Sequence, residues 1–263
     1  MTTPLQGPLA DSGSGLWIRT LMARPGTVTG TVPSGFDAYV RIFHPVQAQL
    51  QEWGQDAPVT VEARTLQWSE LAQLRGTTAH PLMQWHSILA GYRNPVWNEP
   101  GWQYEDPLVG ALAAGALSAT ASILAGHTGT PEQCFAGLWE GWEWLGGAGP
   151  EGTAFGDTDA VNGAGRLELP DRRYLLFETG VDLFTDRSWQ ERNGWDALQS
   201  PNLLWPADRA WFLATEIDFD STIVGGSAAL IADLLEAEAL EARQVPPDGD
   251  LTRLGDLLNE LPD

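Results

Sequence analysis

Three carboxylates stand at alternate positions in the segment ATEIDFDST: Glu216, Asp218 and Asp220. Alternate side chains of a β-strand project from one face and lie about 6.5–7 Å apart. Ionised groups at that spacing repel one another unless water, Arg side chains or a cation compensate them. Since Mg²⁺ and Ca²⁺ prefer carboxylate oxygens, these residues form the candidate metal site of the chain.

Solvation or pairing with Arg is the compensation that we favour for this segment. Residues on neighbouring strands would supply the positive charge, and the candidates are Arg19, Arg41 and Arg173. On that interpretation no cofactor is needed, and Mg²⁺ or Ca²⁺ remains the alternative. The segment is therefore expected to be a polar sheet face first and a cation site second.

Other residue patterns give weaker indications of chemistry. The single cysteine, Cys134, is a possible nucleophile with His127 as its base, although a buried hydrophobic role is more typical of a lone cysteine. The stretch GAGPEG at 147–152 matches G-x-G-x-x-G, but poor helix-forming residues follow it. The sequence contains neither H-E-x-x-H nor G-x-S-x-G, so it offers no common zinc or serine-hydrolase motif.

Alternation and composition predict the elements that must position these residues. Strands are expected at Leu16–Met22, Ala38–His44, Val59–Thr65, Cys134–Trp142, Arg173–Val181, Ala210–Asp218 and Leu240–Val245. Helices are expected at Ser69–Arg75, Leu108–Ala125, Ser227–Glu238 and Asp250–Leu261. Their irregular order predicts an α+β fold, in which a mostly antiparallel or mixed sheet packs with several helices, including a buried Ala-rich helix.

The domain organisation is predicted as one unit with two irregular parts. Residues 1–15 are rich in Pro, Gly and Ser and are expected to form a loose tail. Residues 16–263 are expected to form a single α+β domain with a Gly-rich mobile insertion at 146–165. The Ala-rich stretch 108–125 is assigned to the core and not to a membrane, because no Arg flanks it closely.

Charge narrows the class of partner. The formal net charge is −21, every one of the 14 basic residues is Arg, and residues 146–263 alone carry −15. Such a surface repels nucleic acids and anionic lipids and attracts basic proteins or cations. With one cysteine and no visible signal peptide, the sequence predicts a cytoplasmic protein that contacts neither nucleic acid nor membrane.

Three segments carry a family resemblance: Ser200–Ile231, Thr130–Trp142 and Val40–Pro45. They resemble a set of uncharacterised actinobacterial proteins with no assigned function. The resemblance implies a bacterial, soluble protein, and it brings no activity or known site.

Two functions follow as hypotheses. The first is a binding protein whose acidic surface meets a basic protein or a small cationic ligand, with Trp residues as anchors. The alternative is a divalent-metal-dependent hydrolase or transferase that uses Glu216, Asp218 and Asp220. The oligomeric state does not follow from the sequence.

Overall fold

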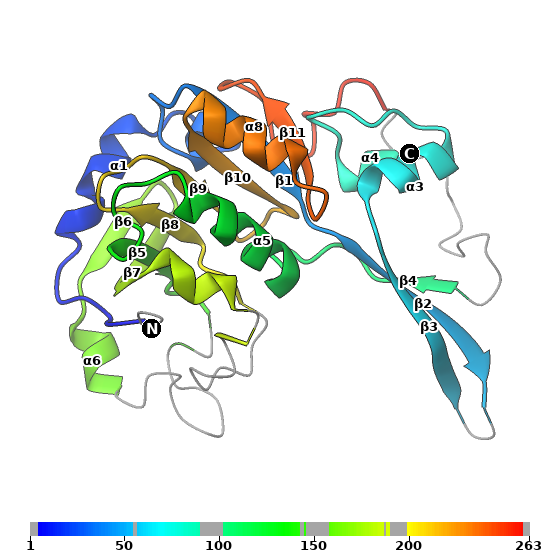
Figure 1. The fold of residues 1–263 in the computed structure, drawn as a ribbon, viewed down its shortest axis with the longest axis horizontal. Helices are drawn as coiled ribbons and strands as arrows, with labels where there is room; N and C mark the ends of the chain where they lie inside the picture. The colour runs from blue at the N-terminus through cyan, green and yellow to red at the C-terminus, as the bar shows by residue number, and fades with distance from the viewer. Residues whose placement is uncertain are drawn as a thin grey trace.

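Two antiparallel sheets form the framework of the molecule in this computed structural model (Figure 1). The structure describes residues 5–54, 57–89, 102–142, 145, 158–186, 188–189 and 199–259, without the side chains of 158–160. The larger sheet has eight strands in the order β11-β1-β10-β9-β8-β5-β7-β6, and the smaller has three in the order β3-β2-β4. This architecture confirms the predicted α+β class.

The strands have these bounds: β1 Ala38–Phe43, β2 Val46–Trp53, β3 Pro58–Leu66, β4 Trp102–Tyr104, β5 Cys134–Trp139, β6 Arg166–Leu169, β7 Arg172–Thr179, β8 Leu203–Pro206, β9 Phe212–Ala214, β10 Ser221–Gly226 and β11 Glu241–Val245. The α-helices are α1 Leu16–Leu21, α2 Val28–Thr31, α3 Trp68–Arg75, α4 Trp85–Ile88, α5 Ala114–Ala125, α6 Thr158–Gly163 and α8 Ala228–Glu236.

Both faces of the larger sheet are covered by other elements. Along β9 and the residue before it, Trp211 and Leu213 enter one hydrophobic core, and Phe212 and Ala214 enter the other. Helices α5 and α8 pack in the first core, whereas α1 and α2 pack in the second. Two buried faces explain why the central strands are apolar throughout and do not alternate with polar residues.

The smaller sheet forms a separate lobe with α3 and α4, and its β2–β3 ribbon projects into solvent (Figure 1). The chain passes from β1 into β2 through His44 and Pro45. Near the end of the ribbon Trp53 is 85% exposed, and Val59 on β3 is also exposed. A third core inside this lobe contains buried aromatic residues such as Trp68.

Three predicted elements are wrong or shortened. Leu16–Met22 was expected as a strand, but Leu16–Leu21 is helix α1, whose buried residue is Ile18. The expected strand Ala210–Asp218 shrinks to β9 because the chain turns directly after it. The Ala-rich helix begins at Ala114 and not at Leu108, and it buries one face.

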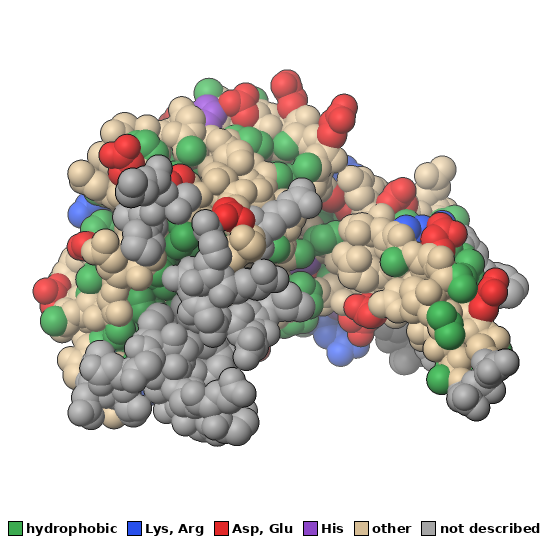
Figure 2. All heavy atoms as spheres, turned by 60° about the horizontal axis from the view of Figure 1, so that its bottom comes forward, with side chains coloured by type: hydrophobic (Ala, Val, Ile, Leu, Met, Phe, Trp, Pro, Cys, Tyr) green, Lys and Arg blue, Asp and Glu red, His purple; other side chains and the backbone are tan. Residues whose placement is uncertain are grey.

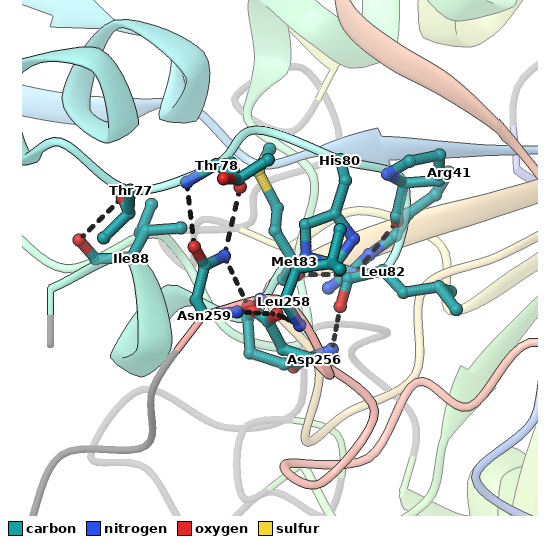
Figure 3. A network of polar contacts seen from close by, with 12 residues as sticks. Arg41, Thr77, Thr78, His80, Leu82, Met83, Ile88, Asp256, Leu258 and Asn259 are labelled. Carbon is teal, nitrogen blue, oxygen red and sulfur yellow. Dashed lines mark hydrogen bonds and ion pairs between the residues drawn. The ribbon is translucent and has the colours of Figure 1, made fainter.

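The expected helix at Asp250–Leu261 is also wrong for the part that the structure describes. Residues 250–259 form turns that dock on the segment 77–84 (Figure 3). Asp256 accepts hydrogen bonds from His80 Nε2 at 2.8 Å and from the Gln84 amide at 3.1 Å. Asn259 bonds both the N–H and the C=O of Thr78. Asp256 and Asn259 therefore join this segment to the small lobe.

The predicted tail and insertion differ from expectation where they are described. Gln6 pairs with Glu178 of β7, and the Leu9 amide donates to the Leu176 carbonyl, so residues 5–15 are not a loose tail. Within the insertion, 158–163 is helix α6, and residues 146–157 lie outside the described residues. Among the helices that are described, none has the length and apolar character needed to cross a bilayer.

Candidate functional site

The candidate site lies at one end of the larger sheet, where β9 ends and β7 begins. Each of the pairs β9–β8, β8–β5 and β5–β7 is antiparallel, so β7 runs opposite to β9. Three reversals of direction place Ala214, the last residue of β9, at the same edge as Arg172, the first residue of β7. Residues distant in sequence therefore meet at this edge of the sheet.

Arg172 joins two of the three carboxylates. Its Nε lies 2.9 Å from Glu216 Oε1, and its Nη2 lies 2.6 Å from Asp218 Oδ2. The side chains of Arg172 and Glu216 are 24% and 20% exposed, whereas that of Asp218 is 71% exposed. One guanidinium thus compensates two carboxylates, and the remaining charge of the pair faces solvent.

A tight turn brings the two carboxylates together. The Asp218 amide donates to Glu216 Oε2 at 2.6 Å, and the Phe219 amide donates to the Glu216 carbonyl at 3.1 Å. Gly110 lies against this turn, because its amide donates to the Phe219 carbonyl and a Cβ there would be 2.7 Å from the Ile217 oxygen. Its φ of 75° also favours glycine.

Asp220 belongs to a different environment. Its Oδ1 lies 3.6 Å from Nη2 of Arg41, a fully buried β1 residue whose Nε donates to Ser221 Oγ. Burial raises the pKa of Asp220 although Arg41 lowers it, and burial lowers the pKa of Arg41 to about 10. The predicted projection of all three carboxylates from one strand face is therefore wrong, since the turn after β9 separates Asp220 from the others.

A pocket of about 330 Å³ opens beside Glu216 and Asp218. It lies over the face of the sheet that packs α1 and α2, and apolar and glycine residues form most of its wall. The lining residues are Met22, Pro25, Gly26, Gly30, Thr31, Leu169, Pro170, Asp171, Arg172, Tyr174, Leu203, Ala214, Glu216, Asp218 and Phe219. Three carboxylates and one guanidinium give this pocket a net negative charge.

Tyr174 is a buried polar residue of the pocket wall. It is 4% exposed, and burial followed by the neighbouring Glu216 raises its pKa well above the ordinary tyrosine value. Its hydroxyl forms no hydrogen bond with any residue of the described segments. The hydroxyl is therefore neutral at physiological pH and available to a bound molecule.

The structure gives little support to a metal at the predicted carboxylates. Across the described segments, no group of three or more His, Cys, Asp or Glu residues is arranged to hold a metal ion. Of the expected Arg partners, Arg41 does pair with Asp220, but Arg173 bonds Glu140 and the partner of Glu216 is Arg172. The metal site remains a prediction from the sequence pattern.

The cysteine and histidine candidates do not form a nucleophilic pair. Cys134 is buried, and burial raises the pKa of its thiol to about 12. His127 instead bonds Asp233 of α8 through Nε2 at 2.7 Å. The glycine motif at 147–152 lies outside the described residues. Neither Cys134 nor His127 lines the pocket.

The candidate anchor tryptophans that the structure describes pack on the hydrophobic cores: Trp205 is buried, and Trp102, Trp139 and Trp142 are half-buried. Trp205 and Trp211 are 1% and 0% exposed, and Trp205 stacks on Phe212 with the ring centroids 5.6 Å apart. Trp97 and Trp144 lie outside the described residues. Among the tryptophans that the structure describes, Trp53 on the ribbon is the one that is mainly exposed to solvent. The pocket therefore takes its apolar surface from aliphatic residues and Phe219.

Sequence reasoning missed Arg172, Tyr174 and Asn202. Asn202 organises the same edge of the sheet, because its Oδ1 accepts from the Trp139 amide and its Nδ2 donates to the Thr215 carbonyl. Arg172 and Tyr174 occupy alternate positions of a strand that was predicted to begin at Arg173. Extending that strand by one residue would have placed Arg172 at an end, although only the sheet order shows which carboxylates it meets.

Comparison with protein-family models, with curated proteins and with solved structures found no match for this chain. These comparisons therefore do not bear on the resemblance to actinobacterial proteins, which stays a prediction.

Proposed function

We propose that this protein is an acidic cytoplasmic binding protein whose pocket at Glu216 and Asp218 takes the cationic group of a basic protein or a small ligand. The observation that carries the proposal is the pocket of about 330 Å³ that these carboxylates border. A concave, largely apolar site with a few convergent polar groups is the common form of a ligand site.

The charge of the molecule supports a cationic partner. The C-terminal half of the sequence, which contributes Glu216 and Asp218, carries −15 of the total −21. Figure 2 presents one face of the molecule, on which acidic side chains outnumber basic ones. Such a field attracts cations over about one Debye length and raises their rate of encounter with the pocket.

The cytoplasmic location is part of this proposal, and the single cysteine of the sequence supports it. The alternative function, a metal-dependent hydrolase or transferase, rests on the spacing of the three carboxylates in the sequence. Arg172 occupies two of them, so the geometry favours binding over metal catalysis.

Titration of the protein with n-pentylammonium chloride, followed by calorimetry or NMR, tests the proposal. We expect saturable one-site binding with a Kd on the order of 1 mM, because the probe is small. The variant Glu216→Gln, Asp218→Asn should weaken binding at least about tenfold, since it removes both charge-assisted acceptors. Raising the salt concentration should also weaken it.

The double variant Glu236→Gln, Glu238→Gln is the matched control, because it also removes two negative charges. Glu236 ends α8, which packs on the opposite face of the sheet, and neither Glu236 nor Glu238 lines the pocket. An equal loss of affinity in this control and in the pocket variant would show that only diffuse charge attracts the probe. The proposal would then fail.

A further inference from the structure

Tyr174 lines the same pocket as Glu216 and Asp218, and the residue is 4% exposed. Among the residues that the structure describes, none accepts from or donates to its hydroxyl. The hydroxyl oxygen is not enclosed by protein, so water in the pocket can bond it. A ligand in the pocket can replace that water and bond the hydroxyl instead.

The acceptors left in the pocket match a particular cation. Arg172 takes Oε1 of Glu216 and Oδ2 of Asp218, while Asp218 Oδ1 accepts no hydrogen bond from a described residue. A second planar guanidinium would compete with Arg172 for the same pair of facing oxygens. A compact ammonium has three N–H donors that point in different directions. The acceptors available for these three donors are Asp218 Oδ1, the remaining lone pairs of the Glu216 carboxylate oxygens and the Tyr174 hydroxyl.

The wall of the pocket accounts for the rest of the ligand. Leu203, Ala214 and Phe219 line it beside the carboxylates, and each belongs to or packs against the second core. Apolar surface of this kind binds a hydrocarbon stem and leaves only the cationic end in contact with polar atoms.

We infer that the pocket selects a primary alkylammonium group on an unbranched apolar stem, and that Tyr174 is the residue that distinguishes this group from other cations. The inference rests on the proposed function, because it assumes that the pocket binds a cation. A free alkylamine and the lysine side chain of a partner protein share this chemistry.

A cycle of two probes and two proteins tests the inference. The probes are n-pentylammonium and n-pentyltrimethylammonium, which carry the same charge and stem, but the second has no N–H donor. The proteins are the wild type and Tyr174→Phe. The wild type should bind pentylammonium at least about tenfold more tightly, and Tyr174→Phe should lose about tenfold for pentylammonium and little for the trimethyl probe.

The outcomes separate the inference from the proposed function. Equal affinity of the wild type for both probes, or an equal effect of Tyr174→Phe on both, overturns the selection of ammonium and leaves cation binding intact. If neither probe binds, both proposals fail. An unchanged midpoint of thermal unfolding in Tyr174→Phe verifies that the variant is folded.

A third probe, N-acetyl-lysine N-methylamide, separates the two sources of the ammonium group. Tighter binding of this probe than of pentylammonium assigns the pocket to a lysine of a partner protein. Tighter binding of pentylammonium assigns it to a free amine. If the lysine derivative and its Nε-trimethyl form bind with equal affinity, the selection of a primary ammonium is contradicted in a protein context.

Discussion

Tyr174 makes a prediction about stability that does not depend on any ligand. Its hydroxyl bonds no described residue and is open to water in the pocket, so replacing it with hydrogen removes no contact within the described protein. We expect the free energy of unfolding of Tyr174→Phe to lie within about 1 kcal/mol of the wild-type value. Urea unfolding measures this difference, and a loss of more than about 1 kcal/mol would show that the hydroxyl has a structural partner.

His44 is a second buried residue, and it affects how the stability of the protein depends on pH. Its Nδ1 lies 2.5 Å from the Leu108 carbonyl, which can only accept, so Nδ1 carries the proton. Its Nε2 then accepts from Thr222 Oγ1 at 2.9 Å. Burial lowers the pKa of His44 from 6.5 to about 4, so this ring stays neutral in the folded protein.

This pKa difference predicts a loss of stability in mild acid. Between pH 6.5 and 4 the unfolded chain binds a proton at His44 that the folded protein does not, so the free energy of unfolding falls as pH is lowered. The loss from this residue totals about 3 kcal/mol and is complete near pH 4. Unfolding measured across this range should show a shallower slope in His44→Gln than in the wild type.

At the scale of elements, the turn between β9 and β10 is held by Arg172 of another hairpin. The ion pairs are partly exposed, so we expect Arg172→Gln to change the free energy of unfolding by less than about 1 kcal/mol. The same variant frees two carboxylate oxygens and removes a positive charge from the pocket. Binding of pentylammonium should therefore become several-fold tighter, and weaker binding would show that Arg172 itself contacts the ligand.

The docking of the C-terminal segment is a second feature at this scale. Asp256 accepts hydrogen bonds from His80, from the Gln84 amide and from both the amide and the side chain of Asn259 (Figure 3). These bonds outweigh burial and lower its pKa. Its contribution to stability is therefore present above the ordinary Asp pKa and is lost as pH falls through the lower, folded value.

Asp256→Asn should release this segment from the small lobe. We expect a loss of about 2–4 kcal/mol, because several buried donors lose a charged acceptor. Hydrogen exchange should accelerate first at residues 77–84 and 256–259. Asp233→Asn, which alters an exposed carboxylate on α8, provides the control. Equal exchange rates in Asp256→Asn and the wild type would show that the segment docks by other contacts.

The local residue pattern predicted those elements in which the intrinsic preference of the residues matches the packing around them. Their β-branched and aromatic residues predicted the strands β1, β3, β5, β7 and β11. The N-cap residue Ser227 predicted α8, and its hydroxyl accepts a hydrogen bond from the Leu230 amide. Leu16–Leu21 failed because its apolar residues suit a strand as well as a short helix, and packing in the second core decides between them.

The site was only half predictable for a related reason. The sequence identified Glu216 and Asp218, since their spacing is local. It missed their partner, because Arg172 reaches them through a sheet order that crosses two intervening strands. Alternation also cannot show where a strand stops, so Asp220 was grouped with carboxylates from which the turn separates it.

At the scale of the whole molecule, charge and pocket have distinct roles. The net charge of −21 attracts any cation at long range, whereas the apolar wall and the Tyr174 hydroxyl act only on a bound molecule. The association rate should therefore fall steeply with salt, while the preference for primary over trimethylated ammonium should be nearly independent of salt. Stopped-flow and equilibrium titrations at two salt concentrations separate these effects, and a preference that vanishes with salt would assign it to charge alone.

The location of bound cation on the protein tests the central claim most directly. Backbone amide shifts recorded by NMR during titration of the wild type with n-pentylammonium report where the probe lies. Binding in the pocket predicts saturable changes concentrated at residues 169–174 and 214–219, with the same midpoint. Changes spread over the acidic surface, including α8, and without saturation would contradict the assignment of this pocket.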